Sequence, residues 1–297
     1  MRIVSLVPSA TELLFALGVG DEVTAVTHEC DHPPAARELP RVTRDVIGPG
    51  LDAGEIDRAV RELTREGRSI YELDEAALQR LQPDLIVTQA LCAVCAVSYD
   101  DVKAVAERLD SRPQVLSLDP TTLGEVLGDV RTLADATDRK DAGVDVVSAA
   151  ASRIDRVRLS VRAAERPRVA ALEWLDPVYV AGHWTPQLID YAGGEDVLGL
   201  AGERSEVHSW EAVAATRPEV VVVMPCGYDA ERSLEEAYTF EDELAALGAE
   251  RVVAVDASAY FSRPGPRLID GLELLAHVLH PDRVPEAPAA ALPVELD

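Results

Sequence analysis

The sequence predicts an α/β protein built from two Rossmann-like parallel-sheet lobes joined by a long helix, with a ligand cleft between the lobes. Short apolar strands alternate with helical segments along most of the 297 residues, a pattern typical of parallel sheets with right-handed crossovers. The alternation stops over residues 120–166, where the chain is charged and helical, and then restarts.

An internal repeat supports the two-lobe prediction. Residues 81–87 (LQPDLIV) match residues 216–222 (TRPEVVV) at a constant offset of 135, and each segment follows a short helix. We therefore expect an N-terminal lobe over 1–119, a bridging helix over 120–166, a C-terminal lobe over 167–283 and a loose, Pro- and Ala-rich tail over 284–297.

The elements of the first lobe follow from short apolar runs and from helix signals. A helix begins near Pro8, where Ser9 and Glu12 have the spacing of a capping box, and Gly18 or Gly20 can end it. The further helices are expected over 53–65, 74–81 and 101–109. The strands are expected over 3–7, 22–27, 84–88 and 114–118.

The second lobe repeats this design after the bridge. The bridge reads as one helix, broken at most once, with Gly124, Gly128 and Gly143 as its weak points. Strands are then expected over 168–173, 220–224 and 251–256. Helices are expected from residue 186 and over 210–215 and 266–279.

Composition excludes some partners. The chain carries 53 acidic and 28 basic residues, a net charge of −25, which argues against binding nucleic acid or an anionic membrane. The N-terminus reads as a short strand without a secretory signal, and no apolar run approaches a membrane span, so we expect no direct membrane insertion. The chain as written predicts a cytoplasmic location, or a periplasmic or extracellular one if a signal was removed.

The four cysteines all lie just past predicted strands: Cys30, Cys92, Cys95 and Cys226. In parallel α/β sheets, ligands bind beyond the carboxyl ends of the strands. Four thiolates there would suit zinc or an iron–sulfur cluster, with His28 and His183 as spare ligands. A redox or ligand-contacting pair and plain buried thiols are the other interpretations.

Aromatic and polar residues flank the first strand of the second lobe. Trp174, Asp176, His183 and Trp184 lie in two neighbouring segments. Indole faces suit a large flat ligand while their N–H groups remain available, and a neutral His183 imidazole could approach a ligand metal. A loop plugged by its own tryptophan is the alternative interpretation. Trp210, at a helix start, is expected in the core.

Further candidates follow the later strands and the first one. Tyr228 and Tyr260 offer contact area, and Arg263 suits an anionic ligand group, whereas Arg267 could instead pair with an acid. Ser9 and Thr11 are explained equally well as caps or as ligand contacts. Glu29 is a possible proton-transfer group. No motif names a nucleophile with its base, so a binding protein is favoured over an enzyme.

Three features of the sequence resemble the cobalamin-binding branch of ABC-transporter solute-binding proteins. They are the motif of residues 5–13 (SLVPSATEL), Gly18, and the strands opened by PDLI at 83–86 and PEVV at 218–221. This helical-backbone metal-receptor class, also called the class III periplasmic binding protein fold, has two α/β lobes and one rigid bridging helix. The missing export signal, the four cysteines and the segments 27–33, 91–95 and 173–177 indicate a distinct subgroup.

The resemblance implies a protein that holds a metal-bearing macrocycle, cobalamin or another corrinoid, between its lobes, with an ABC permease as partner if the protein is exported. The alternative is a cytoplasmic metalloprotein or redox enzyme with a Cys-ligated zinc or iron–sulfur site. The ligand-binding candidates are Pro8, Ser9, His28, Glu29, Gln89, Trp174, Asp176, His183, Trp184, Tyr228, Tyr260 and Arg263. The metal ligands of the alternative are Cys30, Cys92, Cys95 and Cys226.

Overall fold

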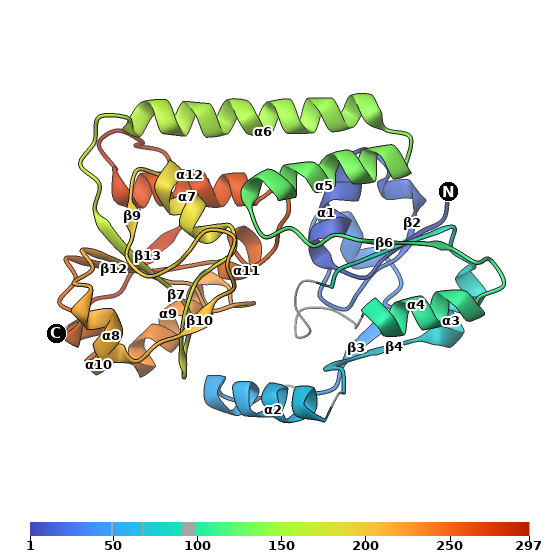
Figure 1. Ribbon diagram of the computed structural model, residues 1–297, viewed down its shortest axis with the longest axis horizontal. Helices are drawn as coiled ribbons and strands as arrows, with labels where there is room; N and C mark the ends of the chain where they lie inside the picture. Colours follow the sequence, from blue (N-terminus) through green and yellow to red (C-terminus); the bar gives the residue numbers. More distant parts are fainter. Residues whose placement is uncertain (49, 67, 91–98, 297) are drawn as a thin grey trace. The chain divides into compact units, whose positions relative to one another are not determined.

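The computed structural model describes residues 1–48, 50–66, 68–90 and 99–296, and the chain forms two compact units (Figure 1). Unit 1 comprises residues 1–120 and 127–147, and unit 2 comprises residues 121–126 and 148–297. The chain enters unit 2 briefly at residues 121–126, returns to unit 1, and passes to unit 2 for the rest of its length within helix α6 (Lys140–Val161). The predicted α/β fold with two sheet-containing lobes is confirmed.

Unit 1 is built on a parallel sheet with strand order β2-β1-β5-β6. The strands are β1 (Ile3–Ser5), β2 (Val23–Ala25), β5 (Leu85–Thr88) and β6 (Gln114–Ser117). Alternate side chains enter two cores. Ile3 and Val87 pack with α1 (Pro8–Ala16) and α5 (Leu123–Ala136), whereas Val4 and Ile86 pack with α3 (Glu75–Leu81) and α4 (Tyr99–Arg108). Burial on both faces explains the near-continuous apolar strands.

A small antiparallel sheet that the sequence did not predict belongs to unit 1. It pairs β3 (Thr43–Asp45) with β4 (Tyr71–Leu73), and α2 (Ala53–Arg65) lies between these strands in the chain. Helix α2 has a complete capping box, in which Asp52 and Glu55 each accept a hydrogen bond from the other's backbone N–H. Two 3₁₀ turns, Gly20–Glu22 and Pro34–Glu38, complete the unit.

Unit 2 contains a mixed sheet with strand order β10-β8-β7-β11-β12-β13, and β9 also pairs with β7. Its parallel centre is β7 (Arg168–Leu175), β11 (Val220–Val223) and β12 (Arg251–Val255). The predicted parallel sheet is therefore extended by antiparallel strands. The remaining strands are β8 (Val178–Val180), β9 (Glu195–Asp196), β10 (Glu206–Val207) and β13 (Ala291–Pro293).

Helices cover both faces of the unit 2 sheet (Figure 1). One face packs against α8 (Trp210–Ala215), α9 (Ala230–Thr239) and α10 (Glu241–Ala246). The other is covered by α7 (Thr185–Tyr191) and α12 (Leu268–Leu279), while the short α11 (Ala257–Tyr260) follows β12. Trp210 stacks on Phe240 and packs against the core, as predicted.

The internal repeat holds in the structure residue by residue. Strands β5 and β11 have the same length at the predicted offset of 135. The helix before each of these strands is followed by a residue with a positive φ. This residue is Gln82, with a φ of 48°, before β5 and Arg217, with a φ of 50°, before β11, and the two are again 135 positions apart. Equivalent sequence thus produces equivalent helix-to-strand turns.

Three expectations need correction. Helix α1 has Val7 as its N-cap without a side-chain cap, because Pro8 takes the first helical position, so Ser9 and Glu12 form no capping box. The bridge breaks between α5 and α6, where Asp138 has a φ of 56°, rather than at its glycines. The tail is not loose, because β13 pairs with β12 and Val294 is buried.

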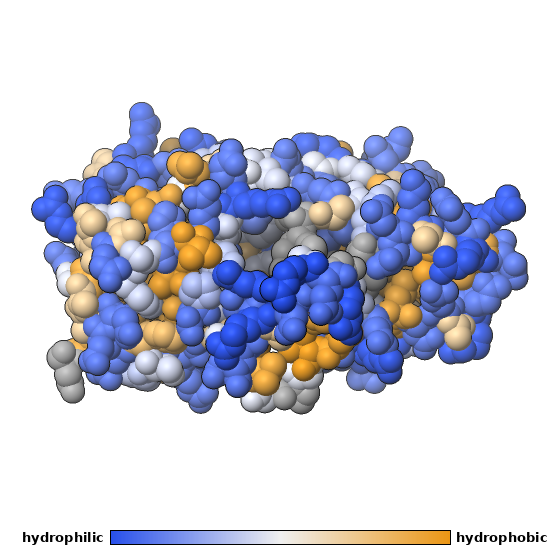
Figure 2. Space-filling model, turned by 60° about the horizontal axis from the view of Figure 1, so that its bottom comes forward, coloured by the Kyte–Doolittle hydropathy of each residue, from blue (hydrophilic) through white to orange (hydrophobic). Residues whose placement is uncertain are grey.

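The surface of the described residues is mainly hydrophilic. Hydrophilic residues cover most of the face shown in Figure 2, and apolar residues form separate patches on it. No helix among the described residues is long and apolar enough to cross a membrane.

Candidate functional site

The predicted site residues of unit 1 follow the carboxyl ends of its parallel strands. Pro8 and Ser9 come after β1, His28 and Glu29 after β2, and Gln89 after β5. Because these three strands are neighbours in the sheet, their carboxyl ends share one edge. Pro8, Ser9 and Gln89 are buried, His28 is half-buried and Glu29 is more exposed.

Cys30 belongs to the core of this edge. Its side chain is 1% exposed, and its Sγ lies 3.1 Å from the hydroxyl oxygens of both Thr11 and Thr27. The Thr11 hydroxyl also donates to Ser5 Oγ at 2.8 Å. A thiol enclosed by two hydroxyls in an apolar cluster behaves as a small core residue.

His28 and Glu29 form a polar cluster with the β3–β4 sheet. His28 Nδ1 lies 2.8 Å from Thr43 Oγ1, and the imidazole packs on the Tyr71 ring with centroids 5.1 Å apart. The Tyr71 hydroxyl donates to Glu29 at 3.0 Å. These contacts fix the orientation of the imidazole through Nδ1. Thr43 and Tyr71 were missed in the sequence because neither strand of their sheet was predicted.

The predicted site residues of unit 2 lie at several strand ends. Trp174 is near the end of β7 and Asp176 follows it, Tyr228 follows β11, Tyr260 and Arg263 follow β12, and His183 and Trp184 follow the antiparallel β8. Two backbone hydrogen bonds join the segments: Cys226 N–H donates to the Glu173 carbonyl at 3.0 Å, and Ser258 N–H donates to the Tyr228 carbonyl at 3.0 Å. Gly227 has a φ of 81°, which a glycine adopts without strain. This turn leaves Cys226 exposed and Tyr228 buried.

Trp174 and Tyr228 form an aromatic wall at this edge. Their rings meet edge to face with centroids 5.5 Å apart, and Trp174 remains partly exposed. The indole N–H of Trp174 donates to the Asp176 carbonyl at 3.1 Å, while the Asp176 side chain is exposed. The wall therefore offers apolar contact area, and the expected free indole N–H is wrong for Trp174.

The expectation for Trp184 is also wrong in this respect. The side chain is 5% exposed, and its N–H donates to the Phe261 carbonyl at 2.8 Å. Trp184 is thus mainly a packing residue, in line with the plugged-loop alternative. The position depends on Gly182, where a Cβ atom would lie 2.5 Å from the Glu203 carbonyl oxygen.

His183 remains half-buried beside Trp184, with ring centroids 5.5 Å apart. Its φ is 51°, and its backbone N–H donates to the Glu203 carbonyl at 2.6 Å. Burial, together with the positive charge of Arg204, lowers the pKa of His183. The imidazole is therefore neutral at pH 7, the form that coordinates metals.

Charged residues gather around Asp256, the residue that follows β12. Burial raises the pKa of Asp256, which caps α11 by accepting from the Ala259 N–H at 2.7 Å. The positive charges of Arg263 and Arg267 lower the pKa of Asp256 and so oppose the effect of burial, whereas the negative charge of Asp229 raises it. Burial also raises the pKa of the half-buried Tyr260, so its hydroxyl stays protonated. Arg263 thus belongs to a mixed-charge group.

Arg232 is a residue at this edge that the sequence analysis missed. Its guanidinium lies 3.7 Å from the centroid of the Tyr228 ring. The available signal was the spacing of Tyr228 and Arg232, which places an aromatic and a cation one helical turn apart. That spacing becomes informative only once α9 is known to begin at Ala230.

The structure does not bring the cysteines together in a metal site among the residues it describes. Those residues contain no group of three or more His, Cys, Asp or Glu side chains arranged to hold a metal ion. Cys30 is enclosed in unit 1, and Cys226 is exposed in unit 2. Cys92 and Cys95 lie outside the described residues.

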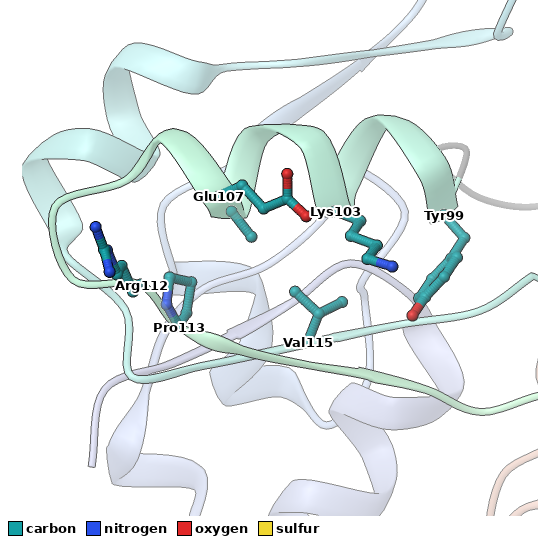
Figure 3. Close-up of a pocket in the computed structure, with 7 residues that line it drawn as sticks. Tyr99, Lys103, Glu107, Arg112, Pro113 and Val115 are labelled. Carbon is teal, nitrogen blue, oxygen red and sulfur yellow. The ribbon is translucent and has the colours of Figure 1, made fainter.

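A separate hollow of about 410 Å³ lies between α4 and β6 in unit 1. Tyr99, Lys103 and Glu107 line it from one face of α4, with Val115 on the strand beneath and Arg112 at the other end (Figure 3). No predicted site residue lines this hollow. It is therefore distinct from the edge where the candidate residues gather.

Comparisons with known proteins agree with this fold. A family model described as periplasmic binding protein matches residues 3–246. The vitamin B12-binding protein of Vibrio cholerae is 23% identical over 289 residues, covering 92% of this chain and 86% of that protein. An uncharacterized ABC transporter substrate-binding lipoprotein of Bacillus subtilis is 23% identical over 299 residues, covering 96% of this chain and 82% of that protein.

Solved structures show the same fold. The crystal structure of a periplasmic vitamin B12-binding protein of Vibrio cholerae matches with a TM-score of 0.67 and 22% identity, covering 94% of this chain and 96% of that one. A periplasmic heme-binding protein of Roseiflexus sp. RS-1 matches with a TM-score of 0.68 and 24% identity, covering 95% of this chain and 98% of that one.

Proposed function

Because the chain belongs to the periplasmic binding protein family, we propose that it binds a metal-bearing macrocycle, namely cobalamin or another corrinoid. The observation that carries this proposal is the aromatic wall of Trp174 and Tyr228 at the carboxyl edge of β7 and β11. A planar macrocycle would bury its apolar face on the exposed part of Trp174, which the buried Tyr228 supports from behind. The vitamin B12-binding relative supports the choice of a corrinoid.

The chain offers two imidazoles for the metal of such a ligand. His183 is held neutral by burial, and His28 is oriented through its Nδ1 by Thr43. An imidazole fixed at one nitrogen by a hydrogen bond presents the other in a defined direction, which is how metal-bound histidines are commonly arranged. Both therefore remain proposed contacts, together with Pro8, Ser9, Glu29, Gln89 and Arg263.

The test is an absorption spectrum with elemental analysis of the protein purified without oxygen, before and after adding cobalamin. A shifted corrin spectrum with stoichiometric cobalt would support the proposal. Hemin serves as the parallel probe, because a heme-binding protein has the same fold. If the protein binds hemin but no corrinoid, the ligand class is wrong. Stoichiometric zinc or iron with binding of neither macrocycle would favour the cysteine-ligated alternative.

The family also suggests a partner. Its B. subtilis member is named as an ABC transporter substrate-binding lipoprotein, and we propose that an ABC permease receives the ligand from this protein. This role requires the protein to act outside the cytoplasmic membrane, which is the second of the two locations that the sequence left open, the first being the cytoplasm. Cell fractionation of the native host separates the two, and retention of the protein in the cytosol would rule out the permease role.

A further inference from the structure

Arg232 is held in a defined position by the aromatic wall. Its guanidinium lies 3.7 Å above the Tyr228 ring, a short distance for such a stack, and the same ring meets Trp174 edge to face. Tyr228 is 4% exposed, whereas Arg232 is exposed. The stack therefore fixes a solvent-facing cation on the same tyrosine ring that the partly exposed indole contacts.

The guanidinium keeps its hydrogen-bonding capacity. Asp229 Oδ1 accepts the backbone N–H of Arg232 at 2.8 Å, and among the described residues no hydrogen bond from the guanidinium itself is found. An arginine presents its N–H groups in a planar fork that matches carboxylate and phosphate. Tyr228 covers one face of the Arg232 guanidinium, so the N–H groups along the guanidinium edge are left to bind a ligand.

The position of this cation opposes the local rules of helix formation. Asp229 is the N-cap of α9, which makes Arg232 the third helical residue, in the first turn, where the helix dipole disfavours positive charge. Helix α2 shows the favoured alternative, because Asp52 is its N-cap and Glu55 at the same third position completes a capping box. A residue that opposes the stability of its own helix in this way is typical of a functional position.

We infer that Arg232 is an anion-recognition residue of the ligand site, and that the ligand carries a phosphate or carboxylate group positioned next to its flat face. This inference rests on the proposed function, because it assigns the face of the ligand to Trp174. The anionic group would be the phosphodiester of a complete corrinoid or the propionate of a porphyrin. Both present oxygens that the guanidinium fork can bind in the same way.

The experiment compares probes that differ in that group. Cobalamin carries a phosphodiester that cobinamide lacks, and hemin carries propionates that its dimethyl ester lacks. Binding of each is measured by absorption titration for the unaltered protein and for Arg232→Gln and Arg232→Glu. Arg158→Gln is the matched control, because Arg158 also lies over a tyrosine in unit 2, 4.8 Å from the Tyr191 ring, but away from the aromatic wall.

We expect Arg232→Gln to weaken binding of the pair member that carries the phosphodiester or the propionates about tenfold to a hundredfold, and to leave binding of the member that lacks this group unchanged. Arg158→Gln should change neither. Arg232→Glu should abolish the preference for the anionic probe and raise the Tm, because it completes a capping box with Asp229. A purely structural arginine would instead lower the Tm when replaced.

Two further outcomes are distinguishable. If the unaltered protein binds neither corrinoid nor porphyrin, the proposed function fails, and the inference fails with it. If it binds a probe pair but Arg232→Gln weakens both members equally or neither, the proposed function stands and the role of Arg232 is overturned.

Discussion

The two units place different chemistry at equivalent edges of similar sheets. The carboxyl edge of unit 1 carries small hydroxyl and thiol groups that bond to each other, such as Thr11, Thr27 and Cys30. The corresponding edge of unit 2 carries the partly exposed Trp174 and the Arg232–Tyr228 stack. The hydroxyl and thiol groups of unit 1 thus bond to one another, whereas the indole and the guanidinium of unit 2 face solvent, so we expect ligand discrimination to reside mainly in unit 2.

The largest contrast should be in thiol reactivity. In a protein carrying Cys92→Ser and Cys95→Ser, a thiol reagent should modify the exposed Cys226 rapidly, whereas Cys30, at 1% exposure, should react only after unfolding. Opening free energies of several kcal/mol make this difference about a thousandfold or more in rate. A bound macrocycle should slow the modification of Cys226. Equal reactivity of Cys30 and Cys226 in the folded protein would contradict the predicted difference.

The next contrast separates contact from packing among the tryptophans of unit 2. Trp174→Ala should reduce affinity for the bound macrocycle about tenfold to a hundredfold with little change in Tm, because the side chain is partly exposed at the site. Trp210→Ala should leave affinity unchanged and lower the free energy of unfolding by about 2–4 kcal/mol, because it removes the stack on Phe240. Calorimetry and titration measure both effects, and a reversed result would place the site elsewhere.

The ion pairs of the two units should also differ. Arg153 on α6 donates to Glu273 at 2.9 and 2.6 Å and to Asp270 at 2.6 Å, in partly buried surroundings within unit 2. Arg153→Gln should lower the free energy of unfolding by about 1–3 kcal/mol, because two shielded carboxylates lose their partner. Arg44→Gln breaks the exposed pair with Glu72 in unit 1 and should cost less than about 0.5 kcal/mol. Denaturant titration measures the loss of unfolding free energy in each variant. Similar losses in the two variants would show that burial does not determine how much an ion pair contributes to stability.

The smallest expected effect is a pH dependence in unit 2. Burial raises the pKa of Asp196, whose Oδ2 is enclosed with no hydrogen-bond partner among the described residues. The folded state therefore binds this proton more tightly than the unfolded state, so stability falls as pH rises from the unfolded value of about 3.9 through the folded one. Asp196→Asn should raise stability by about 1 kcal/mol at pH 7 and not at pH 3. A gain that persists at pH 3 would show that charge is not the cause.

The sequence predicted elements well where local signals were complete. Helix α2 matches its predicted bounds, and the repeat located β5 and β11 with the correct register because both strands lie between a helix end and a short apolar run. It failed where tertiary pairing decides the structure, as for the short strands β3 and β4. It also placed a capping box at Ser9, although Pro8 fixes the start of that helix and moves the N-cap two residues earlier, to Val7.

The candidate site was predicted by position more successfully than by chemistry. Most residues expected at the carboxyl ends of parallel strands do lie there, since parallel topology determines that placement, whereas His183 and Trp184 follow the antiparallel β8. Hydrogen-bond partners could not be predicted, so the indole N–H groups of Trp174 and Trp184 were taken as free although backbone carbonyls accept from both. Arg232 escaped notice because its role depends on the three-dimensional stack with Tyr228.

The pairing of β13 with β12 matters for handling the protein. Val253, Ala254 and Val255 of β12 are covered on their outer edge by residues 291–293, which lie close to the C-terminus. Trimming or fusing the chain within this segment would expose a valine-rich edge strand whose free backbone groups can pair with another molecule. A purification tag is therefore better attached beyond residue 297 through a flexible spacer, and a variant shortened before residue 290 should aggregate more readily than the full chain.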